Sequence, residues 1–181
     1  DHARQLAKKG SPSGTIVWAH EQTAGRGRQG NSWVSMPGNL FMSIIQRPKT
    51  DSSNVGQLSF IAAVALANVL AKILPATVTI DLKWPNDVLL NRKKAAGILL
   101  ETESQVTGST PWVVIGIGVN ITAAPENAVS LYDFGVTAYK AEEILEFLAG
   151  ELENLVRQWE SDGFEGIRAA WLARAYKLGE P

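Results

Sequence analysis

Residues 78–101, VTIDLKWPNDVLLNRKKAAGILLE, contain the clearest secondary-structure pattern in the chain. Three apolar runs alternate there with two short polar segments, which is typical of strands joined by turns. Val78–Leu82 is predicted to be a strand. Val88–Leu90 and Gly97–Glu101 are predicted to form a hairpin around the polar residues 91–94. The stretch therefore predicts a hairpin-rich β region in the middle of the chain.

Strands and helices are also predicted on both sides of this region. The further strands are Thr15–Glu21, Leu40–Gln46 and Pro111–Asn120. Three helices are predicted at Ala3–Lys9, Lys140–Trp159 and Glu165–Tyr176. A fourth begins at Ser53 or Asn54, either of which can act as the N-cap, and runs to about Leu74. A regular βαβ repeat is missing from this order, so the sequence predicts an α+β fold.

The composition fits one globular domain and excludes several classes of protein. The chain has 181 residues, of which 45% are hydrophobic, and a net charge of −1. Balanced charge gives no reason to expect nucleic acid or a membrane surface as a partner. No run reaches the roughly 18 apolar residues of a membrane span. Cysteine is absent and histidine occurs only at His2 and His20, which argues against disulfides, a thiol nucleophile and a multi-histidine metal site. We expect a cytoplasmic protein.

Residues 25–30, GRGRQG, place two arginines between glycines directly after a predicted strand. Glycine lets backbone N–H groups approach a ligand closely, and the planar arginine side chain binds carboxylate or phosphate. The motif therefore suits a small anionic ligand, although a surface loop with solvated arginines is an alternative. The spacing also matches Gly-x-Gly-x-x-Gly, but no helical pattern follows it, which argues against a dinucleotide-binding fold.

Two further motifs lie in the central β region. Lys83–Asp87, KWPND, combines a cation, an aromatic ring, an amide and a carboxylate in five residues. The oxygens of Asn86 and Asp87 suit Mg²⁺, although Pro and Asn-Asp are also common in plain turns. Lys94 is followed by small residues up to Gly97, which allow a ligand to come close. Basic residues in a hairpin are otherwise often only solubilising.

Residues 116–120, GIGVN, place two glycines inside a predicted strand. Glycine destabilises a strand interior, so this pattern favours either a β-bulge or the close approach of another group. The amide of Asn120 could then donate to and accept from the edge of a nucleotide base.

The order and spacing of these four motifs resemble the biotin–protein ligase family. The matching text is GRGRQG followed by W.S..GNL, then KWPNDVLL, K.AGILLE and IGIGVNI, and the resemblance extends over about residues 1–178. It implies a class II aminoacyl-tRNA-synthetase-like fold, with a mixed, largely antiparallel sheet packed against helices. It also implies ATP- and Mg²⁺-dependent conversion of biotin to biotinyl-5′-AMP, and transfer of biotin to a lysine of a biotin carboxyl carrier protein.

The resemblance also implies roles for individual residues. Arg28 and Lys94 would be catalytic. The biotin site would consist of Gln22, Gly25, Arg26, Gly27, Arg28, Trp33, Lys94 and Gly97. The ATP side would consist of Arg28, Asn86, Asp87 and Asn120, with Asn86 and Asp87 as the residues that hold Mg²⁺. Asp87 is also the candidate base for the acceptor lysine.

Residues 1–181 are expected to form one ligase catalytic domain. Two segments of the family are expected to be absent: the Ser-Thr-Asn ahead of the position of Asp1, and the small β-barrel after the position of Pro181. Asn31 stands where the family often has arginine. The alternatives are a lipoate–protein ligase of the same fold, and a biotin-responsive regulator if a DNA-binding domain lies outside this chain. A homodimer is left open, and neither nucleic acid nor a membrane is expected as a partner of this domain.

Overall fold

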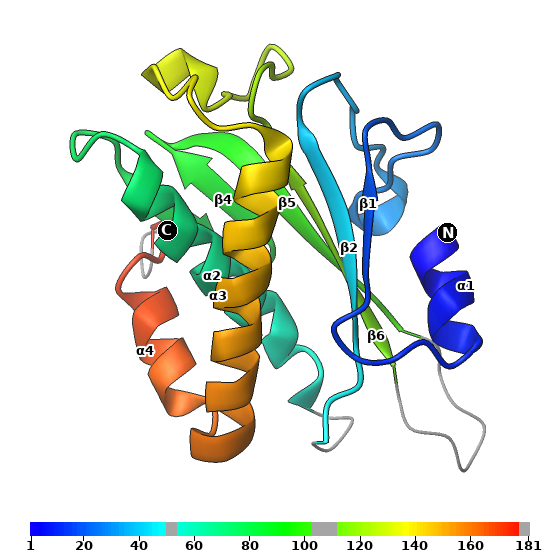
Figure 1. Cartoon of the computed structure of the whole chain (residues 1–181). Helices are drawn as coiled ribbons and strands as arrows, with labels where there is room; N and C mark the ends of the chain where they lie inside the picture. The colour runs from blue at the N-terminus through cyan, green and yellow to red at the C-terminus, as the bar shows by residue number, and fades with distance from the viewer. Residues whose placement is uncertain (50–53, 103–111, 178–181) are drawn as a thin grey trace.

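A six-stranded sheet runs through the centre of the structure, a computed structural model that describes residues 1–49, 54–102 and 112–177 (Figure 1). The strands are β1 (Ile16–Ala19), β2 (Leu40–Gln46), β3 (Ile80–Lys83), β4 (Asp87–Leu90), β5 (Lys93–Thr102) and β6 (Val113–Val119). Their order across the sheet is β1-β2-β6-β5-β4-β3, and all five neighbouring pairs are antiparallel. The predicted α+β fold with a largely antiparallel sheet is confirmed.

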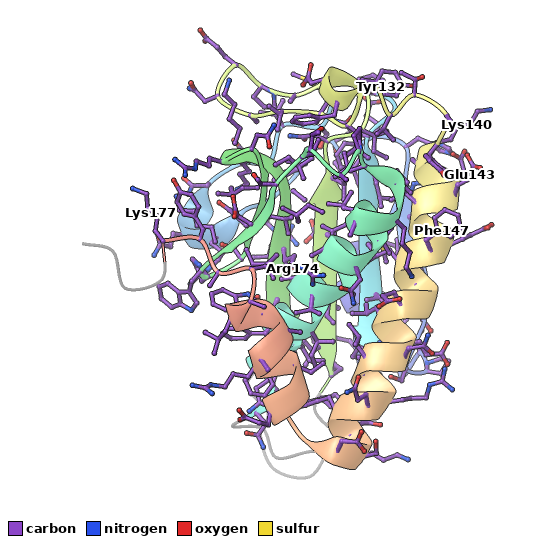
Figure 2. All side chains as sticks on the ribbon, turned by 90° about the vertical axis from the view of Figure 1, so that its left-hand side faces the viewer. Tyr132, Lys140, Glu143, Phe147, Arg174 and Lys177 are labelled. Carbon is purple, nitrogen blue, oxygen red and sulfur yellow. The ribbon has the colours of Figure 1, made fainter. Side chains whose placement is uncertain are left out.

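Three helices cover one face of the sheet (Figure 1). They are α2 (Gln57–Ile73), α3 (Ala141–Asp162) and α4 (Glu165–Leu172). α2 packs against four strands and against α3, and its apolar residues are almost all buried. The predicted apolar face of α3 is also confirmed, because Ile144, Leu148 and Leu152 are completely buried. Figure 2 shows Glu143 and Phe147 on the outer side of α3, away from the sheet.

The fourth helix, α1 (His2–Lys8), packs against the opposite face of the sheet. Ala3 and Ala7 of α1 form a small second core with Ile45 of β2 and Val114 of β6. α1 covers only part of this face (Figure 1), which leaves the rest of it available to the loops between the strands.

A β-bulge interrupts the pairing of β4 with β5. Asp87 lies opposite Gly97, and Leu89, two residues further on, lies opposite Lys94, so that Ala95 is an extra, unpaired residue of β5. Residues opposite each other share a face of the sheet, so the bulge places Lys94 on the same face as Asp87. In a regular strand Ala95 would share that face with Gly97, and Lys94 would lie on the face covered by helices.

The turn between β4 and β5 is shorter than predicted. It consists of Asn91 and Arg92, which both have positive φ, whereas Lys93 and Lys94 already belong to β5. A two-residue turn with positive φ at both positions matches the twist of the strands that it joins. The predicted polar turn over 91–94 is therefore wrong in its second half.

The start of α2 also differs from the prediction. The N-cap residue is Gly56, without a side-chain capping hydrogen bond, and not Asn54. The side-chain oxygen of Asn54 instead accepts a hydrogen bond from Gln57 Nε2 at 3.2 Å. Ser53, the other predicted cap, lies outside the described residues, as does Pro111, the predicted first residue of the last strand.

The predicted last helix ends early, and the chain after it joins the sheet. α4 ends at Leu172, and Leu82 of β3 then donates its N–H to Arg174 O at 2.7 Å and accepts from Tyr176 N at 2.9 Å. The side chain of Arg174, labelled in Figure 2, donates to Asn68 Oδ1 of α2 at 2.9 Å. No helix within the described ranges combines the length and apolar character needed to cross a membrane.

Candidate active site

A cavity of about 720 Å³ lies on the face of the sheet that α1 leaves uncovered. The residues that line it come from the start of the chain with α1, from β1 and the loop before β2, from the central strands β2, β5 and β6, and from the KWPND segment. They include most of the predicted site residues: Gln22, Arg26, Gly27, Arg28, Trp33, Asn86, Asp87, Lys94 and Gly97. Motifs that are far apart in the sequence thus meet around one hollow.

The loop over residues 22–33 contains a tight hairpin. Trp33 N donates to Gly25 O at 2.9 Å, Gly27 N donates to Asn31 O at 2.7 Å, and Arg26 forms an antiparallel bridge with Ser32. A Cβ on Gly25 would lie 2.5 Å from Trp33 O, so only glycine allows this pairing. Gly25 therefore shapes the loop and is not among the residues that line the cavity.

Trp33 lies directly on two glycines of the sheet. Gly97 of β5 and Gly118 of β6 are opposite each other in the register. A Cβ would lie 2.7 Å from the indole at Gly97 and 2.6 Å from it at Gly118. Trp33 Nε1 is buried without a hydrogen-bond partner and lies over Gly118, where an added Cβ would be 2.9 Å from it. The paired glycines thus form a floor on which the indole rests.

Lys94 and Asp87 form an ion pair at the edge of the cavity. Lys94 Nζ lies 2.7 Å from Asp87 Oδ1 and 5.4 Å from the centre of the Trp33 ring, within reach of a cation–π interaction. Asp87 Oδ1 is buried and has no partner with hydrogen-bond geometry, so the ion pair with Lys94 is its charged contact. Asp87 therefore holds the ammonium group of Lys94 beside the indole.

Arg26, predicted to bind biotin, is paired with carboxylates. Its guanidinium lies 3.1 Å from Glu101 Oε1 and 2.8 Å from Asp1 Oδ1, and Arg4 lies 3.7 Å from the same Glu101 oxygen. Arg28 is exposed at the tip of the hairpin and lines the cavity. Of these two cavity-lining arginines, Arg26 is held by carboxylates, whereas Arg28 has no ion-pair partner among the described residues.

Sequence reasoning missed Glu101 as a site residue. Glu101 lies on β5 four residues after Gly97, so the period-two alternation of the strand places both on the cavity face. That alternation was the available signal. Ser43, which lies opposite Gly116 and lines the cavity, was also missed, because it belongs to none of the four motifs.

The two asparagines assigned to the ATP side support the backbone. The side-chain amide of Asn86 donates to Ile98 O at 2.7 Å, and the main-chain carbonyl of Asn86 accepts from Ile98 N at 2.9 Å. Asn120 is only 2% exposed and donates to Val129 O at 3.2 Å, but its Oδ1 is buried without a partner. Asn120 is not among the residues that line the cavity.

The residues present fit a protein-held Mg²⁺ poorly. Asp87 directs its buried Oδ1 to the ammonium group of Lys94, which competes with a metal ion for that oxygen. Among the residues that the structure describes, no group of three His, Cys, Asp or Glu side chains is close enough to hold a metal. Mg²⁺ is often held through one or two carboxylates plus substrate phosphates, so a protein cage is not a requirement.

Known proteins resemble this chain in sequence and in structure. It is 42% identical over 174 residues to the biotin–[acetyl-CoA-carboxylase] ligase of Paracoccus denitrificans, covering 91% of this chain and 72% of that protein. It is 34% identical to the bifunctional ligase/repressor BirA of Bacillus subtilis, covering 98% of this chain but only 56% of that protein.

Two solved structures share the fold. The biotin protein ligase of Aquifex aeolicus in complex with biotin and ATP has a TM-score of 0.82 at 27% identity, over 97% of this chain and 75% of that one. The Leishmania major ligase in complex with biotinyl-5-AMP has a TM-score of 0.80 at 26% identity, over 98% of this chain and 77% of that one. The model of the biotin/lipoate A/B protein ligase family matches residues 3–120, and the chain belongs to that family.

Proposed function

We propose that residues 1–181 form a catalytic domain that converts biotin and ATP to biotinyl-5′-AMP and then transfers biotin to a lysine of a biotin carboxyl carrier protein. One observation carries the proposal. The arginine hairpin, the Trp33 indole on its glycine floor and the Lys94–Asp87 pair surround a single cavity. The names of the reported relatives support the same activity.

The first step needs positive charge where two anions meet. The biotin carboxylate attacks the α-phosphorus of ATP, and the bond to pyrophosphate breaks. Negative charge develops on the phosphate oxygens, and Arg28 and Lys94, which both line the cavity, offset it. Preorganised donors of this kind are worth about 2.7–4 kcal/mol each. The Asp87 carboxylate keeps Lys94 in place before the substrates arrive.

The second step needs the acceptor lysine as a neutral amine. The acceptor lysine attacks the carbonyl carbon of the adenylate, the bond to AMP breaks, and the amine gives up a proton. Asp87 is the carboxylate beside Lys94 in the cavity, so we assign it as the proton acceptor. Because water would hydrolyse the adenylate, the hairpin with Trp33 has a second purpose as a cover over the intermediate.

Mg²⁺ would enter with the phosphates of ATP, and its role here would be to offset their charge. We place the reaction in the cytoplasm, and the homodimer remains a prediction. Lipoate is the alternative substrate because the family model includes lipoate ligases.

The experiment incubates the chain with biotin, MgATP and a purified carrier domain, and follows pyrophosphate release and a streptavidin blot. We expect both signals with biotin and neither with lipoate. A streptavidin-positive carrier that forms without ATP, or equal pyrophosphate release with lipoate, would contradict the proposal.

A further inference from the structure

Asn39 is a buried asparagine that binds the chain immediately after β6. It is 2% exposed and lies one residue before β2. Its Oδ1 accepts hydrogen bonds from Ile121 N at 2.8 Å and Thr122 N at 3.0 Å, and its Nδ2 donates to Ala123 O at 2.8 Å. One side chain thus takes the place of a neighbouring strand for three residues.

The backbone pairing of β2 with β6 ends where these contacts begin. The last pair of the ladder is Leu40 with Val119. Beyond it, Asn120 N donates to Ala95 O of β5 at 2.8 Å, and Asn120 O accepts from Leu131 N at 3.1 Å. The side chain of Asn39 therefore links the main chain after Asn120 to the β2 side of the sheet, together with the hydroxyl of Thr122, which donates to Pro37 O at 2.8 Å.

We propose that Asn39 is a positioning residue for the nucleotide side of the active site and acts through Asn120. The inference rests on the proposed function and on the predicted contact of Asn120 with the nucleotide base. Asn120 Oδ1 is buried without a partner, which agrees with a side chain held ready for a ligand. Asn39 itself is not among the residues that line the cavity, so it acts by holding the backbone.

Asparagine suits this position because it both accepts and donates. An apolar residue would leave the N–H groups of Ile121 and Thr122 and the carbonyl of Ala123 without their partner. Aspartate would keep the acceptor but would direct a charged oxygen at the Ala123 carbonyl, which it now approaches as a donor. Buried groups that lose their partners destabilise the segment that carries them.

The test compares Asn39→Ala with the unchanged chain in pyrophosphate release, with ATP varied at saturating biotin and biotin varied at saturating ATP. We expect the KM for ATP to rise about tenfold, because the loss of one hydrogen bond changes a binding constant by about that factor. The KM for biotin should stay within about twofold. Equal changes in both KM values, or no change in either, would overturn the inference.

A matched control is Asn68→Ala. Asn68 of α2 likewise makes side-chain hydrogen bonds, to Glu151 of α3 and to Arg174 in the segment after α4, but it is not among the residues that line the cavity. It is expected to lower the melting temperature without changing the KM for ATP. A rise in the KM for ATP in this control would show that lost stability alone explains the Asn39 effect.

Asn39→Asp serves if the alanine variant does not fold. It keeps the acceptor for Ile121 and Thr122, so the KM for ATP is expected to rise by about threefold, and a larger rise in the KM for biotin would overturn the inference. Hydrogen exchange of the same two amides gives a readout without activity, with faster exchange expected in Asn39→Ala. If the unchanged chain forms no adenylate, the proposed function fails, and hydrogen exchange still decides whether Asn39 holds this segment.

Discussion

Gly118→Ala tests whether the Trp33 indole forms a wall of the biotin site. The added Cβ would lie 2.6, 2.8 and 2.9 Å from three atoms of the indole. Carbon atoms in ordinary contact are about 3.5–4.0 Å apart, so the ring would have to retreat by about 1 Å. The ring can move because it belongs to a loop hairpin, whereas β6 lies at the centre of the sheet.

The expected loss is therefore larger in binding than in stability. Overpacking a rigid core costs about 1–3 kcal/mol, and a ring that can retreat should bring the cost to the lower end. A 1 Å displacement of a substrate-positioning group can lower the rate by about a hundredfold. We expect kcat/KM for biotin to fall by up to about this factor, with the fold retained.

The assay is pyrophosphate release with biotin varied, together with thermal unfolding followed by circular dichroism. Gly150→Ala is the matched control, because a Cβ at this position of α3 has no neighbour within 4 Å. The control should keep full activity and gain about 0.5–1 kcal/mol of stability, since alanine favours a helix over glycine. Biotin kinetics within twofold of the unchanged chain in Gly118→Ala would refute the role of the indole.

Three other substitutions test the charges and the core. Arg28→Ala should lower adenylate formation by about a hundredfold or more, the loss measured for a single preorganised donor, and leave the melting temperature unchanged, because the side chain is exposed; normal pyrophosphate release would remove Arg28 from catalysis. Lys94→Ala should lower both activity and melting temperature, because it leaves Asp87 without its counter-charge. Adding Asp87→Asn should restore the melting temperature but not the activity. A melting temperature that stays low in the double variant would contradict the pairing. Leu148→Ala should lower the free energy of unfolding by about 2–5 kcal/mol in urea titrations, since this side chain is completely buried; a loss below that range would mean that the helix layer packs loosely.

The sequence predicted best those elements whose own residues carry a strong apolar pattern. Leu40–Gln46 was predicted with the observed bounds, because a continuous apolar run is typical of a strand buried on both faces. The apolar face of α3 also followed from helical periodicity. The order of the strands did not, because the placement of β2 beside β6 depends on contacts between segments far apart in the chain.

For the candidate site, residue types could be predicted better than contacts. Glycines, arginines and a lysine in short motifs indicated where a ligand could approach. The contact of Arg26 with Glu101 joins residues 75 positions apart, and no local pattern indicates it. The burial of Asn120, whose side chain donates to Val129 O, was equally hidden from local sequence patterns.

The unpaired Ala95 in β5 bears on how insertions and deletions should be judged in this part of the chain. Losing one residue from a strand ordinarily inverts every side chain beyond the gap. Here the loss of Ala95 would make the pairing with β4 regular and leave Lys94 opposite Leu89, although it would also remove the carbonyl to which Asn120 N donates. A straight strand that kept all its residues would instead bring Lys93 to the cavity. The extra Ala95 thus decides which of two adjacent lysines faces the cavity, and an alignment gap placed one position away would exchange Lys93 and Lys94.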